Sequence, residues 1–157
     1  MAHTRIALFA LATITVVGAG CGSNRPSNGP DMTRAELTAR ADAVCRRMNT
    51  MRHSITTGIA SFERDYVLLL PPLVAYERSA VTELGRLTPP ASLAGDWQEI
   101  ITNIRTLTKN TATTIEYARS NNLKGLSELN TPDNEADQRI FAIATRDGFS
   151  DCAEFAA

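Results

Sequence analysis

The first helix-forming segment of the chain, residues 33–62, reads TRAELTARADAVCRRMNTMRHSITTGIASF. It opens with a capping box, in which the Thr33 hydroxyl accepts a bond from the amide of residue 36 while Glu36 accepts one from the Thr33 amide. Apolar side chains then recur at steps of three and four residues, so they share one helix face. They are Leu37, Ala41, Val44, Met48, Met51, Ile55, Ile59 and Phe62. The spacing predicts one amphipathic helix that runs to about residue 65.

The most apolar stretch beyond the start of the chain, residues 66–74 (YVLLLPPLV), contains Pro71-Pro72. Proline suits the first turn of a helix but not its interior, because it lacks an amide hydrogen and its ring clashes with the preceding turn. We therefore place the turn between the first two helices here, and the end of the second helix near Leu87. The stretch could form a partner or ligand surface, although core beneath this turn is the simpler interpretation.

Two more periodic segments come next. One runs from near Ser92 to about Ser120, with a Thr-rich middle of low helix propensity. The other has Thr131 as its N-cap and Pro132 as its first residue, and it ends at Gly148. Short connections make consecutive helices antiparallel neighbours. The sequence therefore predicts an all-α, up-down-up-down four-helix bundle over residues 33–157.

The beginning of the chain has the order of an export signal. Arg5 precedes an apolar run, residues 6–17 (IALFALATITVV), and small residues then lead to Cys21. As a helix the run is about 18 Å long, which is short for a permanent span of a bilayer core of about 30 Å. We expect a cleaved signal peptide at residues 1–20, and a lipidated cysteine with a disordered tether at residues 21–32. An ordinary secretory signal or an uncleaved anchor is the alternative.

The residues Val17-Gly18-Ala19-Gly20-Cys21 resemble the lipobox of bacterial lipoproteins. The resemblance implies that the Cys21 thiol carries diacylglycerol and that the protein is anchored in membrane lipid on the extracytoplasmic face of the cell membrane. Gly18 departs from the branched apolar residue that the family prefers three positions before the cysteine. Two or more acyl chains would give stable anchoring, whereas one gives marginal binding.

The other two cysteines form a candidate pair. If Cys21 carries lipid, Cys45 and Cys152 remain, and an even number in an exported domain indicates a disulfide. In the predicted bundle, the end of the fourth helix lies beside the first half of the first helix. This topology brings Cys152, just beyond Gly148, within reach of Cys45. We predict a Cys45–Cys152 disulfide, with two buried free thiols as the alternative.

Composition and motifs give little indication of catalysis. The chain has 16 basic and 17 acidic residues, without the basic footprint that nucleic acids require. Beyond the signal, His53 is the single histidine, and alone it can form neither a metal cluster nor a nucleophile–base pair. Glycine-rich phosphate loops and Cys-x-x-Cys motifs are lacking from the sequence. We therefore expect no enzyme activity, no cofactor and no metal site, and an exposed His53.

Charged residues elsewhere have simpler interpretations than a binding site. The first helical segment is rich in arginine, which could contact an anionic lipid or an acidic envelope polymer, but interleaved carboxylates favour a solvated face. The arginines are Arg40, Arg46, Arg47, Arg52 and Arg64. Carboxylates near the predicted start of the fourth helix are interpreted as partners of the helix dipole and as solvated surface. They are Asp133, Glu135 and Asp137.

Three short motifs are shared with small lipoproteins of actinobacteria, which the chain beyond its signal resembles. They are Ala41-Asp42-Ala43-Val44-Cys45, Leu87-Thr88-Pro89-Pro90 and Phe149-Ser150-Asp151-Cys152. The group has no established common activity, so the resemblance implies fold and location only. We expect a non-catalytic binding or structural module for an envelope protein or polymer. The alternative is a small-molecule or lipid carrier, with its site between the helices beside residues 66–74 and the Thr-rich middle of the third helix.

Overall fold

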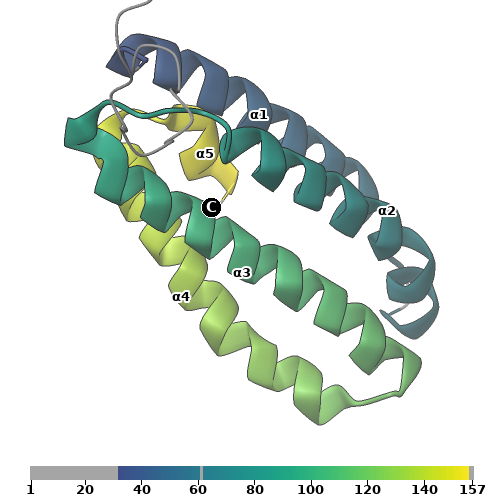
Figure 1. Cartoon of the computed structure of the whole chain (residues 1–157). Coiled ribbons are helices and arrows are strands. Elements are labelled where there is room, and N and C mark those ends of the chain that lie inside the picture. Colours follow the sequence, from purple (N-terminus) through teal and green to yellow (C-terminus); the bar gives the residue numbers. More distant parts are fainter. Residues whose placement is uncertain (1–31, 61, 156–157) are drawn as a thin grey trace, which may run out of the picture.

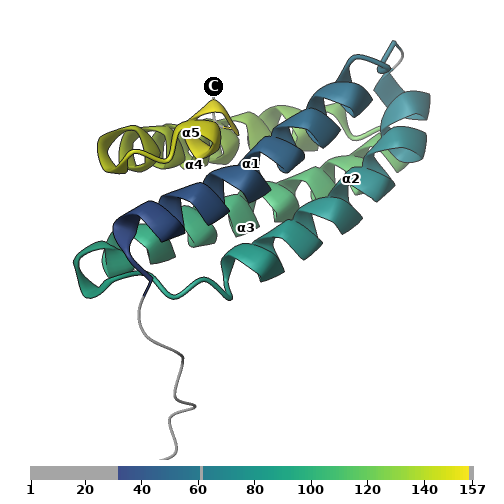
Figure 2. The ribbon, with the colours of Figure 1, turned by 90° about the horizontal axis from the view of Figure 1, so that it is seen from above.

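The computed structural model describes residues 32–60 and 62–155, and over these residues the chain is all-α. Its helices are α1 (Arg34–Thr56), α2 (Phe62–Leu84), α3 (Ala94–Arg119), α4 (Leu123–Asp147) and the short α5 (Ser150–Phe155), with a 3-10 turn, η1 (Ala91–Leu93), before α3. Figure 1 shows α1 beside α2 and α3 beside α4. Each long helix packs on the next along the chain, and α5 packs on both α1 and α4 (Figure 2). The predicted all-α bundle is confirmed, and α5 is an addition to it.

The start of α1 agrees closely with the sequence pattern. The Thr33 amide donates to Glu36 Oε2 at 2.9 Å, and the Glu36 amide donates to Thr33 Oγ1 at 3.2 Å, which completes the predicted capping box. These bonds from Thr33 lower the pKa of Glu36 below its usual value. The Met32 amide donates to the carbonyl of Thr88 and so ties the entry of α1 to the loop between α2 and η1.

The turn between α1 and α2 lies earlier than the Pro-Pro pair predicts, so that prediction was wrong. α1 ends at Thr56, and the chain turns at Thr57 and Gly58. Asp65, a buried residue in the first turns of α2, accepts a 2.8 Å bond from the Ala60 amide and thereby holds the turn against the new helix. A Thr-Thr-Gly sequence is itself a turn signal, and the longer apolar periodicity obscured it.

Pro71 and Pro72 lie inside α2. A proline in a helix interior leaves the carbonyl four residues earlier without its amide partner. For Pro72 that carbonyl belongs to Leu68, which is 65% exposed, so water can satisfy it. Leu70 and Leu73, on either side of the pair, are buried. Their packing holds the helix together where intrinsic propensity would break it.

The start predicted for the fourth helix was also wrong, because α4 begins at Leu123 and passes through Pro132. Asn122 caps it by accepting a 2.9 Å bond from the Gly125 amide. A β-carbon on residue 125 would lie 2.8 Å from the Tyr117 ring, so only glycine fits there. The predicted limits of the third helix are confirmed by α3, after which Asn121 takes a left-handed φ of 51°.

The end of α4 is as predicted, whereas the helix beyond it was not foreseen. Gly148 has a left-handed φ of 85°, and the Phe149 amide donates to the Ala144 carbonyl at 2.8 Å, as in a Schellman motif. The chain then forms α5, a six-residue helix. Such a short helix carries no periodicity that a sequence pattern could detect.

Two apolar clusters fill the bundle. The large core is built from all five helices and includes Leu37, Cys45, Met48, Leu84, Trp97, Ile104, Ile140, Phe149 and Cys152. Within it, the rings of Trp97 and Phe149 lie 5.4 Å apart between centroids. The small core contains Leu70, Leu73, Val74 and Ile115, at the end of the bundle where α1 passes into α2. None of the helices in the described part of the chain is long and apolar enough to cross a membrane.

Candidate functional site

The predicted cysteine pair is confirmed, since Cys45 on α1 and Cys152 on α5 form a disulfide with 4.9 Å between their α-carbons. Both sulfur-bearing residues are fully buried in the large core. Cys21, the predicted lipidation site, lies outside the described residues.

The same face of α1 holds α5 through polar contacts. Asp42 accepts bonds from the Asp151 amide at 3.0 Å and from the Ser150 hydroxyl at 3.2 Å, which caps the start of α5. Arg46 donates to the Asp151 carboxylate at 2.9 Å, and Asn49 Nδ2 donates to the Asp151 carbonyl at 2.8 Å. With Cys45, these side chains form one stripe along α1. The stripe is a structural clamp, and it explains the two motifs that contain the paired cysteines.

Most of the arginines of the first helical segment are engaged with carboxylates. Arg46 pairs with Asp151, Arg47 with Glu83 at 2.8 Å, and Arg52 with Glu77 at 3.2 Å. Arg64, at the start of α2, pairs with its neighbour Asp65. The first three pairs join α1 to α5 and α2, and Arg46, Arg47 and Arg64 keep half or more of their side chains exposed, so the expected solvated face also carries ion pairs. His53 is exposed near the end of α1, as expected.

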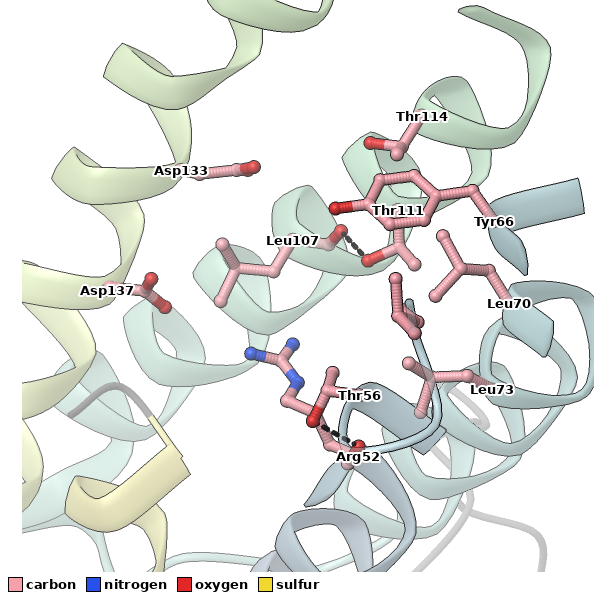
Figure 3. A pocket seen from close by; sticks show the side chains of 11 residues that line it. Arg52, Thr56, Tyr66, Leu70, Leu73, Leu107, Thr111, Thr114, Asp133 and Asp137 are labelled. Atoms are coloured by element: carbon pink, nitrogen blue, oxygen red, sulfur yellow. Dashed lines mark hydrogen bonds between the residues drawn. The ribbon is translucent and has the colours of Figure 1, made fainter. Parts of the chain in front are cut away.

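A cleft of about 210 Å³ opens between the two helix pairs, beyond the end of α5. α1 contributes Arg52 and Thr56, and the turn after it contributes Ile59. The other walls come from α2, α3 and α4, with the lining residues Tyr66, Leu70, Leu73, Leu107, Thr111, Thr114, Asp133 and Asp137. Figure 3 shows the Arg52 guanidinium reaching into this space between the apolar side chains and the two aspartates of α4.

One wall of the cleft is apolar. Leu70 and Leu73 of α2, with Leu107 of α3, are nearly fully buried and present methyl groups to the space. The hydroxyl of Thr111 donates to the Leu107 carbonyl at 2.9 Å, and that of Thr114 donates to the Asn110 carbonyl at 3.0 Å. These hydroxyls therefore face the cleft mainly with acceptor capacity.

Charged side chains enter the cleft from α1 and α4. Arg52 Nη2 donates to Glu77 Oε1 at 3.2 Å, and the Glu77 side chain is only 1% exposed. Burial raises the pKa of Glu77, and the positive charge of Arg52 together with the hydroxyls of Thr108 and Thr111 opposes that rise. The Glu77 carboxylate lies behind the cleft, and its negative charge partly compensates the positive charge that Arg52 brings into the cleft.

Two aspartates of α4, Asp133 and Asp137, line the cleft opposite the leucines. Asp133 Oδ1 accepts a 2.7 Å bond from Asn110 Nδ2, a neutral donor. Asp137 Oδ1 is buried and has no hydrogen-bond partner among the described residues. Burial and the nearby charge of Asp133 raise the pKa of Asp137, while Arg52 opposes the rise. Arg52 thus acts on two buried carboxylates, as the ion-pair partner of Glu77 and as the nearby positive charge that opposes the pKa rise of Asp137.

The arrangement can bind a group that donates hydrogen bonds, and the described residues contain no group of three potential ligands arranged to hold a metal ion. Sequence reasoning assigned Asp133 and Asp137 to helix-dipole partners and surface, because it began the fourth helix at Thr131. With α4 starting at Leu123, both aspartates lie in mid-helix, one turn apart on the face toward the cleft. The four-residue spacing of Asp133 and Asp137 was the sequence signal that could have placed both aspartates on one helix face.

No protein-family model matches the chain, and neither does any curated protein or solved structure.

Proposed function

We propose that this chain is an envelope lipoprotein, anchored through an acylated Cys21, whose helical domain binds a ligand without transforming it. Support for the location comes from the order of residues 1–21 and from the Cys45–Cys152 disulfide, a bond typical of exported proteins. With that pair formed, Cys21 is the one cysteine left for another role. The resemblance to actinobacterial lipoproteins agrees with this location.

The location is tested by the intact mass of the protein extracted from its native membrane, with and without reductant. We expect a mass that lacks residues 1–20, carries acyl chains on Cys21 and gains two hydrogens on reduction. A mass without acyl chains would overturn the lipid anchor while leaving the ligand-binding proposal untouched.

The ligand is proposed to bind in the cleft. Its single most informative feature is the buried Asp137 oxygen that lacks a partner among the described residues, opposite a wall of leucine and tyrosine side chains. A buried carboxylate oxygen without a donor is costly, and a ligand that supplies the donor recovers that cost. The ligand that fits is a small amphipathic molecule, with an ammonium group at Asp133 and Asp137 and an apolar body against Leu70 and Leu73.

His53, the one histidine of the described residues, does not line the cleft. The cleft offers a place of recognition for a small ligand, whereas no surface of the described residues is assigned to an envelope protein. This makes the carrier alternative the better supported of the two, because it is the one with a site.

The test uses the full chain in phosphatidylcholine nanodiscs and an NMR titration with cyclohexylammonium, with cyclohexanol as the neutral probe of similar shape. We expect the ammonium to bind and the alcohol to bind at least about tenfold more weakly, since a charge-assisted hydrogen bond contributes about 1.5–3 kcal/mol. Asp137→Asn should reduce ammonium affinity by about tenfold or more.

Glu135→Gln is the matched control, because it removes one negative charge from an exposed position on the same helix. If this variant weakens binding as much as Asp137→Asn, the effect is general electrostatics and the cleft is not the site. Recovery of chemically altered amine would instead show catalysis.

A further inference from the structure

A second concave surface lies between α2 and α3, on the face of α3 opposite the cleft. This basic groove is lined by Arg78, Val81 and Thr82 of α2 and by Arg105, Thr108, Lys109, Ala112, Thr113 and Glu116 of α3, and it encloses about 580 Å³. At 3.6 residues per turn, the α3 residues of the groove and those of the cleft, such as Leu107 and Thr111, point in opposite directions. The groove and the cleft are therefore separate, and they share no lining residue.

Three cations of the described chain face the groove without carboxylate partners. Arg78, Arg105 and Lys109 are exposed, and within the described residues none of them lies in a salt bridge, unlike Arg46, Arg47, Arg52 and Arg146 on other faces. Arg105 and Lys109 are one helical turn apart, and Arg78 comes from the neighbouring helix. Glu116 is the one carboxylate of the groove.

The threonine hydroxyls of the groove already donate their hydrogens to backbone carbonyls, so they have none left for a ligand. Thr108 donates to the Ile104 carbonyl at 3.0 Å. Thr82 donates to the Arg78 carbonyl at 2.9 Å, and Thr113 donates to the Lys109 carbonyl at 3.1 Å. The donors left for a ligand are thus the two guanidinium groups and the ammonium group. A β-carbon on Gly85 would lie 3.6 Å from Arg105 Nη2, so this guanidinium extends back along the groove toward the end of α2.

We propose that the α2–α3 groove binds an extended polyanion that carries phosphate groups, through Arg78, Arg105 and Lys109. Guanidinium and ammonium groups are the side chains that phosphates select, and their charges are uncompensated here although the chain as a whole has a formal net charge of −1. A volume of about 580 Å³ exceeds what a single phosphate needs and lies in the range of ligand sites. The cations line a hollow and not a ridge, so a chain lying in the groove reaches all three, whereas a flat bilayer surface does not.

The experiment titrates the full chain, held in phosphatidylcholine nanodiscs, with short linear polyphosphate, and measures binding by calorimetry at several salt concentrations. Three phosphate contacts predict a slope of roughly −2 for the logarithm of affinity against the logarithm of salt concentration. The triple variant Arg78→Gln/Arg105→Gln/Lys109→Gln should weaken binding by at least about tenfold and flatten the slope. The three side chains are exposed, so the fold should survive, and an unchanged circular dichroism melt verifies this.

Two variants separate the groove from general charge. Arg40→Gln removes one positive charge from an exposed site on α1, as the single groove variant Arg105→Gln does from the groove, and should change affinity by less than about twofold. Glu116→Gln should increase affinity, an effect that misfolding cannot produce. If Arg40→Gln weakens binding as much as a groove variant, or if Glu116→Gln leaves it unchanged, the groove is not the site.

Phosphatidylglycerol added to the nanodiscs tests the other source of phosphate. The proposal expects polyphosphate affinity to fall only by the modest factor that added surface charge imposes, equally in wild type and Arg40→Gln. If phosphatidylglycerol abolishes polyphosphate binding, the groove lies on lipid headgroups and the polymer proposal is overturned. Neither outcome depends on ammonium binding in the cleft, so the two proposals fail separately.

Discussion

The two ends of the bundle are built differently, although the same four long helices run through both. At one end α5 fills the space between α1 and α4, and the large core there is covalently closed by Cys45–Cys152. At the other end α5 is absent, the small core is limited to a few side chains of α2 and α3, and the cleft separates α1 from α4. A six-residue helix therefore decides which half is packed and which half is open.

The difference shows that packed contacts and the open cleft follow one another along a single helix. Between Asp42 and Asn49, the inward face of α1 is occupied by contacts to α5. One turn later, Arg52 and Thr56 on the same helix face the cleft. The packed half can hold the fold, so the open half can carry partly unsatisfied charge, a pattern expected of functional sites.

Removal of the disulfide is expected to have the largest effect. Cys45→Ala with Cys152→Ala should lower the free energy of unfolding by up to about 4–5 kcal/mol, because the closed loop spans a sequence separation of 107 residues. Urea unfolding of the variant and of reduced wild type measures this. If cyclohexylammonium affinity falls in parallel under native conditions, the two halves are not independent.

A matched pair of core variants compares the halves directly. Leu37→Ala, at a fully buried site of the large core, should cost about 3–5 kcal/mol, whereas Leu73→Ala in the small core should cost about 2–3 kcal/mol, because its cavity opens into the cleft and water can enter. Chemical denaturation of both variants gives the difference. Equal costs would mean that the cleft end is packed as tightly as the disulfide end.

The clamp on α5 should contribute less than its covalent bond. Asp42→Ala removes two hydrogen bonds at the start of α5 and should cost about 1–2 kcal/mol. Thr33→Ala, which removes an exposed cap of α1, serves as the reference at about 1 kcal/mol. Hydrogen exchange of the α5 amides should increase in Asp42→Ala and stay unchanged in Thr33→Ala. An increase in both would assign the effect to global stability.

The smallest effect is a pH dependence from the cleft. The folded pKa of Asp137 lies above its usual value of 3.8, so the folded state binds more protons there than the unfolded state, and this contribution to stability falls as pH rises from about 3.8 through the raised pKa. The free energy of unfolding of wild type, minus that of Asp137→Asn, should therefore become smaller as the pH rises over that window.

Glu36 supplies a control of opposite sign. Its pKa is lowered, so its contribution is present above the usual value of 4.5 and is lost as pH falls through the lowered pKa. Thermal melts of wild type and Glu36→Gln across the same pH range should show this. Slopes of the same sign in both comparisons would contradict the assignment of charge states in the cleft.

The caps and the cysteine pair of the large-core half were predictable from sequence, although α5 was not, whereas the helix boundaries of the open half were not predictable. Thr33, the cysteine pair and Gly148 are local or countable signals, and the structure confirms each of them. Pro71-Pro72 and Pro132 were misleading, because tertiary packing outweighs intrinsic helix propensity at these sites. Both errors fall in the half of the bundle that holds the cleft.

The charges show the same division. The arginines of the first helical segment form a visible cluster in the sequence. In the structure, most of them form ion pairs between helices. The cations of the basic groove come from two helices that are separated by a loop, so no local pattern marks them. The carrier function stays a prediction, but the place predicted for its site, beside residues 66–74 and the Thr-rich segment, is where the cleft lies, with Tyr66 and Thr111 among its lining residues.

The disulfide also has a mechanical consequence. Every side chain that lines the cleft or the basic groove lies between Cys45 and Cys152 in the sequence, inside the covalently closed loop. A pulling force applied from the N-terminal side can unravel α1 only as far as Cys45 before it meets a bond that joins two segments of the chain. From that point the disulfide passes the force on to Cys152, so the segment that forms the cleft and the basic groove would unfold later than the helix turns that precede Cys45.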